Sequence, residues 1–276
     1  MNSKIRSANW HITSRCNYKC QFCFAKEVRT ELRDEKKQEE IIRTLRDIGI
    51  EKLNIVGGEP QMHPDFDRIL RLSKDYGLTT TLQTNGSFLT PKNVDYMAKY
   101  LDWIGLSIDS GIEMTELQLG RGPGNHVNHI KKCCSWIHST GVNLKINSTI
   151  TSLNWDEDLH DLINELSPHR WKVFRTLILE NENAHAKYLC PTDEEFHTFV
   201  QNHSDIVLRN GDRPVFEDNE DMIGSYLMIS PDGKLQTNIN GRLEYFNFEN
   251  IIKMNKLNFI DIKKYFRRGA IYEWHV

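Results

Sequence analysis

Three cysteines near the start of the chain have the spacing that most directly implies chemistry. Cys16, Cys20 and Cys23 form the pattern CxxxCxxC in a chain of 276 residues. Three thiolates can bind three irons of a cubane iron–sulfur cluster and leave the fourth iron open to a reactant. A closed zinc site would need a fourth Cys or His close by. His11 is near, but it falls inside an expected strand at residues 9–13, so we favour one 4Fe-4S cluster.

Two further expected strands carry polar residues at every second position. The strand at residues 142–149 contains Lys145 and Asn147, and the strand at residues 170–177 contains Arg170 and Lys172. Alternate side chains of a strand share one face, so these residues point inward if helices cover the outside of the sheet. Buried unpaired cations are costly and need an anion, which a triphosphate supplies. The alternative is that the second strand is rotated by one residue and its charges face solvent.

Short polar or glycine-containing segments follow the other expected strands. Lys52 and Asn54 repeat the inward alternation at residues 52–56, and the segment Gly57-Gly58-Glu59-Pro60 comes next. Glycines there allow the backbone to approach a ligand closely. Asn85 and Arg121 follow later strands and Ser107 lies at the end of another, where short polar side chains could also serve turns and caps. Arg121 lies between two glycines, where its guanidinium could reach a carboxylate.

These segments must be positioned by alternating strands and helices. Strands are expected at residues 9–13, 52–56, 79–84, 103–108, 142–149 and 170–177, and helices at residues 34–48, 66–76, 91–99, 127–140 and 155–166. Such alternation predicts an α/β fold with a parallel sheet, a partial (βα)6 TIM-like barrel. We expect the barrel and the cluster loop within residues 1–180. Residues 181–276 are expected to form a C-terminal extension that caps the active site within the same domain, with a helix at residues 193–203, a polar loop at 210–219 and a hairpin that turns at residues 231–233.

Composition limits the class of protein. The net charge of -3 argues against a protein that coats nucleic acid, and 39% hydrophobic residues allow a large core. No stretch approaches the roughly 18 apolar residues of a membrane span, and the first residues do not resemble a signal peptide. Cys133, Cys134 and Cys190 lack ligand spacing and are interpreted as packing residues. We therefore expect a cytoplasmic monomer in a reducing compartment, without nucleic-acid or membrane partners.

Taken together, these motifs resemble the viperin family of radical S-adenosylmethionine (SAM) nucleotide dehydratases over nearly the whole chain. The shared segments are NYKCxFCF at residues 17–24, GGEP at 57–60, TNGS at 84–87, GRG at 120–122, LKINS at 144–148, RWKVF at 170–174, SYL at 225–227 and FxRGxxYxW at 266–274. The resemblance implies that SAM binds near Gly57, Gly58, Glu59, Asn85, Ser107 and Arg121. It implies a triphosphate site at Lys52, Asn54, Lys145, Asn147, Arg170 and Lys172.

The resemblance also implies a reaction. SAM cleavage yields a radical that takes the 4′-hydrogen of a ribonucleoside triphosphate, and loss of water gives a 3′-deoxy-3′,4′-didehydro nucleotide, which terminates viral polymerase products. An external one-electron donor is then required. CTP is the first candidate substrate, with UTP or GTP as alternatives. Asn9 is implied near the base and Tyr226 near the ribose as a catalytic residue.

Some positions depart from the family pattern. Val56 replaces a small polar residue, and residues 238–245 do not follow the basic segment of animal members, although Arg242 could replace one phosphate contact. Two other functions stay open: a different radical SAM activity such as peptide modification, which usually brings further cysteine-rich domains, and a non-catalytic interaction protein that keeps the cluster as a structural element.

Overall fold

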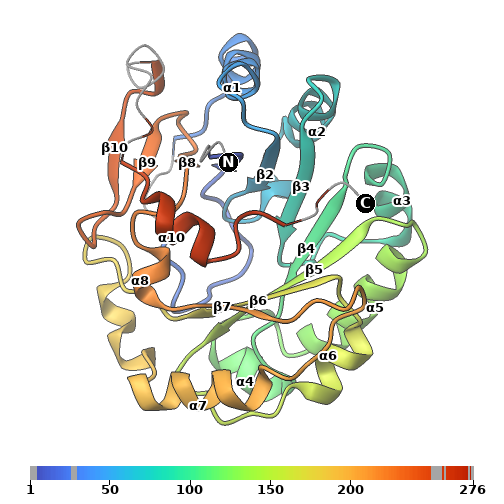
Figure 1. The fold of residues 1–276 in the computed structure, drawn as a ribbon. Coiled ribbons are helices and arrows are strands. Elements are labelled where there is room, and N and C mark those ends of the chain that lie inside the picture. The colour runs from blue at the N-terminus through green and yellow to red at the C-terminus, as the bar shows by residue number, and fades with distance from the viewer. Residues whose placement is uncertain (1–4, 26–29, 250–256, 258, 273, 275–276) are drawn as a thin grey trace.

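A curved sheet with helices on its outer side forms the frame of the molecule (Figure 1). The structure is a computed structural model that describes residues 5–25, 30–249, 257, 259–272 and 274. The strands follow the order β10-β9-β8-β1-β2-β3-β4-β5-β6-β7. Neighbours from β1 to β7 are parallel, β8 is parallel to β1, and β9 pairs antiparallel with both β8 and β10. The fold is therefore the expected α/β partial barrel, left open between its two edge strands.

The strands are β1 (Ser7–His11), β2 (Lys52–Val56), β3 (Thr79–Thr84), β4 (Trp103–Ser107), β5 (Asn143–Ile150), β6 (Arg170–Arg175), β7 (Val215–Glu217), β8 (Met228–Ile229), β9 (Leu235–Thr237) and β10 (Glu244–Phe246). The α-helices are α1 (Glu35–Asp47), α2 (Phe66–Asp75), α3 (Pro91–Met97), α4 (Glu113–Gln118), α5 (His126–His138), α6 (His160–Leu166), α7 (Asp193–His203), α8 (Asn219–Met222) and α10 (Ile262–Arg267). Short 3-10 helices are η1 (Pro60–Met62) and η2 (Ala184–Leu189).

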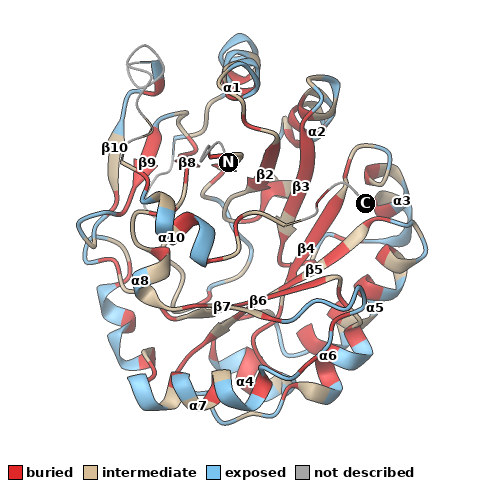
Figure 2. Ribbon diagram, viewed as in Figure 1, coloured by how far each residue is buried: buried red, intermediate tan, exposed pale blue. Residues whose placement is uncertain are grey.

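Period-2 alternation fixes the inner and outer faces of β5 and β6. Leu144, Ile146, Trp171 and Val173 are fully buried beneath the helices, and the intervening polar residues face the inside of the sheet (Figure 2). The Trp171 ring nitrogen donates to Ser148 at 3.0 Å, which satisfies its polar atom within this layer. The alternative in which β6 is rotated by one residue is therefore wrong.

Four expectations about the elements need correction. Residues 210–219 were predicted as a polar loop, but they contain β7, a three-residue strand that pairs with β6. α4 was not predicted, and α6 starts at His160 rather than at residue 155 because the Asn154 side chain binds the Thr151 amide at 2.7 Å and the Asp109 carbonyl at 2.7 Å. β1 begins two residues earlier than expected.

The C-terminal extension completes the sheet and closes one end of it. The hairpin of β8 and β9 adds to the edge of β1, whereas α10 and the segment after it cross the interior in Figure 1. The Trp103 ring nitrogen donates to the Trp274 carbonyl at 3.2 Å, and Arg6 lies 5.0 Å from the Trp274 ring. Both partners stand at the beginnings of strands, so this segment closes the amino end of the barrel. No helix in the described ranges has the length and hydropathy to cross a membrane.

Candidate active site

A cavity of about 680 Å³ occupies the inside of the curved sheet. Its lining includes these residues proposed from the sequence: Asn9, Cys16, Cys20, Cys23, Lys52, Asn54, Gly57, Gly58, Asn85, Ser107, Arg121, Lys145, Asn147, Lys172 and Tyr226. The cysteine loop and the glycine pair follow β1 and β2 at the carboxyl edge of the sheet, whereas Lys52 opens β2 at the amino edge. The cavity therefore has a thiol end and a cationic end.

Close backbone contacts hold the cysteine loop. Gly58 donates its amide to the Thr13 carbonyl at 2.7 Å, and a Cβ on Gly58 would lie 2.2 Å from the Arg15 carbonyl oxygen. A Cβ on Gly120 would likewise lie 2.3 Å from the Lys19 carbonyl oxygen. Both turns require glycine because the cysteine loop packs directly on them. For Gly58, the sequence had suggested only that the backbone can approach a ligand closely.

The three thiols have the surroundings of iron ligands. None of the three forms a disulfide with another described cysteine, and Cys16 Sγ accepts from the Tyr18 amide at 3.4 Å and from Asn85 Nδ2 at 3.7 Å. Burial raises the pKa of Cys20 to about 12, although Arg121 opposes this rise. Thiols must lose their protons when they bind metal, and N–H donors to sulfur stabilise the thiolate form. The donor set fits a 4Fe-4S cluster.

Glu59 stands behind the cavity wall rather than in it. It is fully buried and absent from the lining, and its carboxylate accepts from Thr84 Oγ1 at 2.8 Å and from the Asn85 amide at 2.9 Å. The sequence predicted that SAM binds near Glu59, and the Glu59 side chain points away from the cavity and holds the turn after β3. Asn85 in turn donates to Asn17 Oδ1 at 2.9 Å, so β2, β3 and the cysteine loop are linked.

Arg121 reaches the cavity but is already paired. Its guanidinium lies 2.6 Å from Asp109 Oδ2 and 3.9 Å from Glu116 Oε2, and both carboxylates are fully buried. Burial opposes the charged form, yet Asp109 and the other anions nearby raise the pKa of Arg121 above its usual value. The side chain is thus fixed in position and remains charged. Ser107 lies on the same side, where its hydroxyl accepts from Gln83 Nε2 at 3.2 Å.

Lysines gather at the opposite end of the cavity. Burial lowers the pKa of Lys52 and of Lys145 well below the usual value, and the neighbouring cations add to this effect. Burial also lowers the pKa of Lys172 to about 8, although Glu217 opposes the change. Lys52 lies 4.2 Å from the Tyr272 ring and donates to its hydroxyl. Buried cations at such close quarters indicate a site for an anion.

Two predicted phosphate contacts lie outside the cavity lining. Arg170 is buried with its guanidinium 3.8 Å from the Tyr272 ring, and it donates to the Gly269 carbonyl at 2.5 Å. It therefore fastens the C-terminal segment beneath the site. Arg242 is exposed and does not line the cavity, so its expected phosphate contact is not supported.

Amide side chains line the wall between the two ends. Asn54 donates its amide to Asn9 Oδ1 at 2.7 Å, which couples β1 to β2 at one level of the sheet. The side-chain oxygen of Asn147 is buried and has no hydrogen-bond partner among the described residues. A ligand that offers a donor or a bound cation would satisfy it.

Sequence reasoning missed two charged residues of this region. Glu217, at the end of β7, is fully buried and pairs with Lys172. Arg268 lines the cavity, donates to the Ser225 carbonyl at 3.1 Å, and lies 3.6 Å from the Tyr226 ring. The motif FxRGxxYxW contains Arg268 and could have revealed it. Glu217 is the last residue of β7, a strand too short to give a periodic signal.

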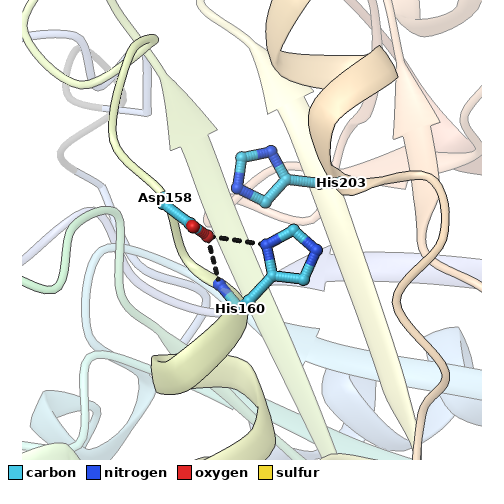
Figure 3. A group of neighbouring side chains, drawn as sticks. All are labelled: Asp158, His160 and His203. Atoms are coloured by element: carbon cyan, nitrogen blue, oxygen red, sulfur yellow. Dashed lines mark hydrogen bonds and ion pairs between the residues drawn. The ribbon is translucent and has the colours of Figure 1, made fainter.

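A second group of titratable side chains lies outside the barrel interior (Figure 3). His160 Nδ1 is 2.6 Å from Asp158 Oδ1, and its Nε2 is 3.1 Å from Asp205 Oδ1. His203 accepts from the Leu159 amide at 3.0 Å and bonds a carbonyl of its own helix at 2.8 Å through its other ring nitrogen. Because every ring nitrogen is engaged, this group joins α6 to α7 and offers no open metal site.

The chain is similar to known proteins both in a family model and over nearly its whole length. Residues 10–166 match the family described as the Radical SAM superfamily. A protein from Thermoplasmatales archaeon strain ISO4-H5, named S-adenosylmethionine-dependent nucleotide dehydratase, is 36% identical over 272 residues, which cover 98% of this chain and 97% of the relative. The dehydratase named RSAD2 of Oncorhynchus mykiss is 32% identical over 97% of this chain and 80% of its own length.

Solved structures share the fold at low identity. Streptococcus suis SuiB bound to S-adenosylmethionine superposes with a TM-score of 0.72 at 18% identity, over 96% of this chain and 68% of SuiB. The structure of anSMEcpe with bound AdoMet and a peptide gives a TM-score of 0.69 at 18% identity, over 92% of this chain and 82% of that chain.

Proposed function

Because this chain belongs to the radical SAM superfamily, and within it to the S-adenosylmethionine-dependent nucleotide dehydratases, we propose that it removes water from a ribonucleoside triphosphate and that CTP is its substrate. It is an enzyme that uses a 4Fe-4S cluster and SAM. The proposed product is the 3′-deoxy-3′,4′-didehydro nucleotide, whose missing 3′-hydroxyl would stop a viral polymerase. When bound, the cluster and SAM together supply the radical that starts the reaction.

The cationic end of the cavity carries this proposal. Lys52, Lys145, Lys172 and Arg268 line it, and among the described residues Glu217 is the carboxylate that pairs with one of them. Four cations and one carboxylate leave an excess of three positive charges in a buried place. A triphosphate supplies several negative charges with many acceptor oxygens, which compensates both the charge and the unused donors.

The separation of the two ends orients the substrate. Cys16, Cys20 and Cys23 lie at the carboxyl edge of the sheet, and the lysines lie near its amino edge. A nucleotide held by its phosphates at the cationic end would present the ribose, rather than the phosphates, toward SAM. A displacement of about 1 Å from such a position can cost on the order of a hundredfold in rate. In this proposal the lysines act chiefly by positioning the nucleotide.

The residues at the SAM end have complementary roles. Ser107 and Arg121 line the cavity beside the cysteine loop, where a hydroxyl and a fixed guanidinium could bind the SAM ribose and carboxylate. Because Asp109 already holds Arg121 at 2.6 Å, the guanidinium is preorganised and loses little freedom on binding. Because Gly57 and Gly58 have no side chains, SAM could lie close to the backbone along this wall.

One hydrogen bond bears on the choice of base. Asn54 occupies the side-chain oxygen of Asn9 at 2.7 Å, so Asn9 would present its NH₂ group to the cavity. A donor at this position favours a base with an acceptor, which cytosine offers at O2 and N3 and uracil at O2 and O4. This contact therefore suits a pyrimidine, and the turnover experiment chooses between CTP and UTP.

Turnover with deuterium-labelled nucleotides tests the proposal. The anaerobically reconstituted enzyme is incubated with SAM, a one-electron reductant and CTP, UTP, GTP or ATP, each deuterated at C4′. We expect CTP to give 5′-deoxyadenosine that contains deuterium, together with the dehydrated nucleotide. If none of the four nucleotides transfers deuterium, the dehydratase proposal is wrong; transfer from UTP or GTP alone would correct the base.

A further inference from the structure

A buried carboxylate stands at the end of the cavity where anions are expected to bind. Glu217 is fully buried at the end of β7, and one of its oxygens forms an ion pair with the Lys172 ammonium. Its other oxygen accepts the hydroxyl proton of Tyr226. A negative charge at this place weakens the attraction of the site for a triphosphate. Its presence therefore calls for a role other than anion binding.

The position of Glu217 connects two groups that reach the cavity. Lys172 and Tyr226 both line the cavity, whereas Glu217 lies behind them and does not. The Lys172 ammonium is 5.8 Å from the Tyr226 ring, so the carboxylate bridges a gap that the two side chains do not close by themselves. Arg268 lies 3.6 Å from the same ring.

We propose that Glu217 carries a proton from Lys172 to Tyr226, and that Tyr226 gives its own proton to the hydroxyl that leaves C3′ of the nucleotide. This inference rests on the proposed function. Tyr226 is the catalytic acid in it, and Glu217 acts through Tyr226 as a positioning and proton-carrying residue.

The step balances as follows. After hydrogen is taken from C4′, the nucleotide is a neutral radical at that carbon. The Tyr226 O–H bond breaks, its proton joins the 3′-oxygen, and the C3′–O bond breaks to release water and leave a radical cation. One electron from the external reductant converts this species to the product. Lys172 then gives a proton to Glu217, Glu217 passes it to the phenolate, and solvent reprotonates Lys172 after the product leaves.

The surroundings of the three groups suit this direction of transfer. Burial raises the pKa of Tyr226 well above its usual value, and Glu217 adds to this effect, so the hydroxyl keeps its proton until an acceptor arrives. Burial lowers the pKa of Lys172 to about 8, which makes its ammonium a ready donor. Arg268, held to the Ser225 carbonyl at 3.1 Å, would stabilise the transient phenolate.

The competing explanation is structural: Glu217 would only neutralise Lys172 in the empty site. Glu217→Gln separates this explanation from the proton relay, because glutamine keeps the size and an acceptor for Tyr226 but cannot carry a proton. The holoenzyme variants are supplied with SAM, reductant and CTP deuterated at C4′, and two quantities are measured. These are deuterium in 5′-deoxyadenosine and the ratio of dehydrated product to 5′-deoxyadenosine.

We expect Glu217→Gln to transfer deuterium but to form about 10-fold less product per 5′-deoxyadenosine, and Tyr226→Phe to behave in the same way. In heavy water the ratio should fall for the wild type, because the proton that Tyr226 transfers is then a deuteron. Glu220→Gln, an exposed substitution in the adjoining helix α8, is the control and should match the wild type.

Three results would overturn the inference. A normal product ratio in either Glu217→Gln or Tyr226→Phe would exclude the relay, and the phenylalanine variant decides the matter if the glutamine variant does not fold. Equal losses of deuterium transfer and product would assign Glu217 a structural role. Absence of deuterium transfer in the wild type would instead refute the proposed dehydratase reaction, and the relay with it.

Discussion

Lys145 offers a sharp test of the cationic site because its charge is costly without a ligand. It lies on β5, lines the cavity, and has no ion pair or hydrogen bond among the described residues. Burial lowers its pKa well below the usual value, with Lys172 and Arg170 adding to the effect. Lys145→Met removes the charge and leaves an unbranched side chain that is one atom shorter. We predict that this variant is more stable than the wild type and binds CTP more weakly.

The magnitudes follow from these contacts. Loss of one charge-assisted contact costs about 1.5 to 3 kcal/mol of binding free energy, or roughly a 10- to 150-fold rise in the Kd for CTP. Relief of charge repulsion should add about 1 kcal/mol or more of stability, which raises Tm by about 2 to 4 °C in a chain of this size. A lysine pKa depressed in the folded state destabilises the fold below that pKa, and the penalty fades as pH rises toward the usual value near 10.4. The gain in Tm should therefore shrink between pH 7 and pH 10.

Thermal denaturation without nucleotide and calorimetric titration with CTP measure the two effects, with SAM present in the titration. Lys92→Met, at an exposed position of α3, is the control and should change neither quantity. An unchanged Kd would show that Lys145 does not contact the substrate. A fall in Tm would show that a favourable interaction stabilises the Lys145 ammonium in the ligand-free protein, which contradicts the predicted charge repulsion.

Further predictions concern the thiol end of the cavity and His160, which lies outside the barrel interior. Replacing all three cysteines of CxxxCxxC by alanine should abolish iron binding, measured by iron analysis after anaerobic reconstitution, and retention of full iron would move the cluster elsewhere. Gly58→Ala should lower the free energy of unfolding by about 1 to 3 kcal/mol and reduce the iron content, because its Cβ would lie 2.2 Å from the Arg15 carbonyl oxygen. A normal iron content would show that the cysteine loop can move to accommodate the methyl group. Arg121→Ala should weaken SAM binding about 10-fold even without nucleotide, and an equal SAM affinity would exclude its role. Hydrogen bonds raise the pKa of His160, with the bond to Asp158 contributing more than the bond to Asp205. His160→Gln should therefore lower Tm at pH 6, where the charge is present, and less at pH 8.5, where it is lost; an equal loss at both pH values would refute the ionic contribution.

Local sequence determined the parts of the site that depend on short spacing. Cys16, Cys20 and Cys23 lie in one loop, so their common position follows from the chain itself. The faces of β5 and β6 followed from alternation, because successive side chains of a strand must point to opposite sides. Lys145 and Lys172 therefore faced inward as expected, and the long strands and helices were found within a few residues.

Tertiary structure decided which inward-facing groups reach the cavity. Arg170 shares the inner face with Lys172, yet the C-terminal segment covers it. The guanidinium donates a hydrogen bond to the Gly269 carbonyl of that segment. Glu59 lies beside the glycine pair, but it faces the turn after β3 and fixes that turn. Backbone periodicity gives only the side of the sheet, and what packs on that side depends on residues far along the chain.

The strongest example is Glu217. Its three-residue strand has no period long enough to detect, and it meets Lys172 and Tyr226 because β7 pairs with β6 while the segment before β8 returns to the same place. Such long-range contacts form when buried polar groups must find partners inside the folded chain. The sequence by itself determined that the chain has a cluster loop and a cationic strand face; the fold decided which acid, base and cation stand together.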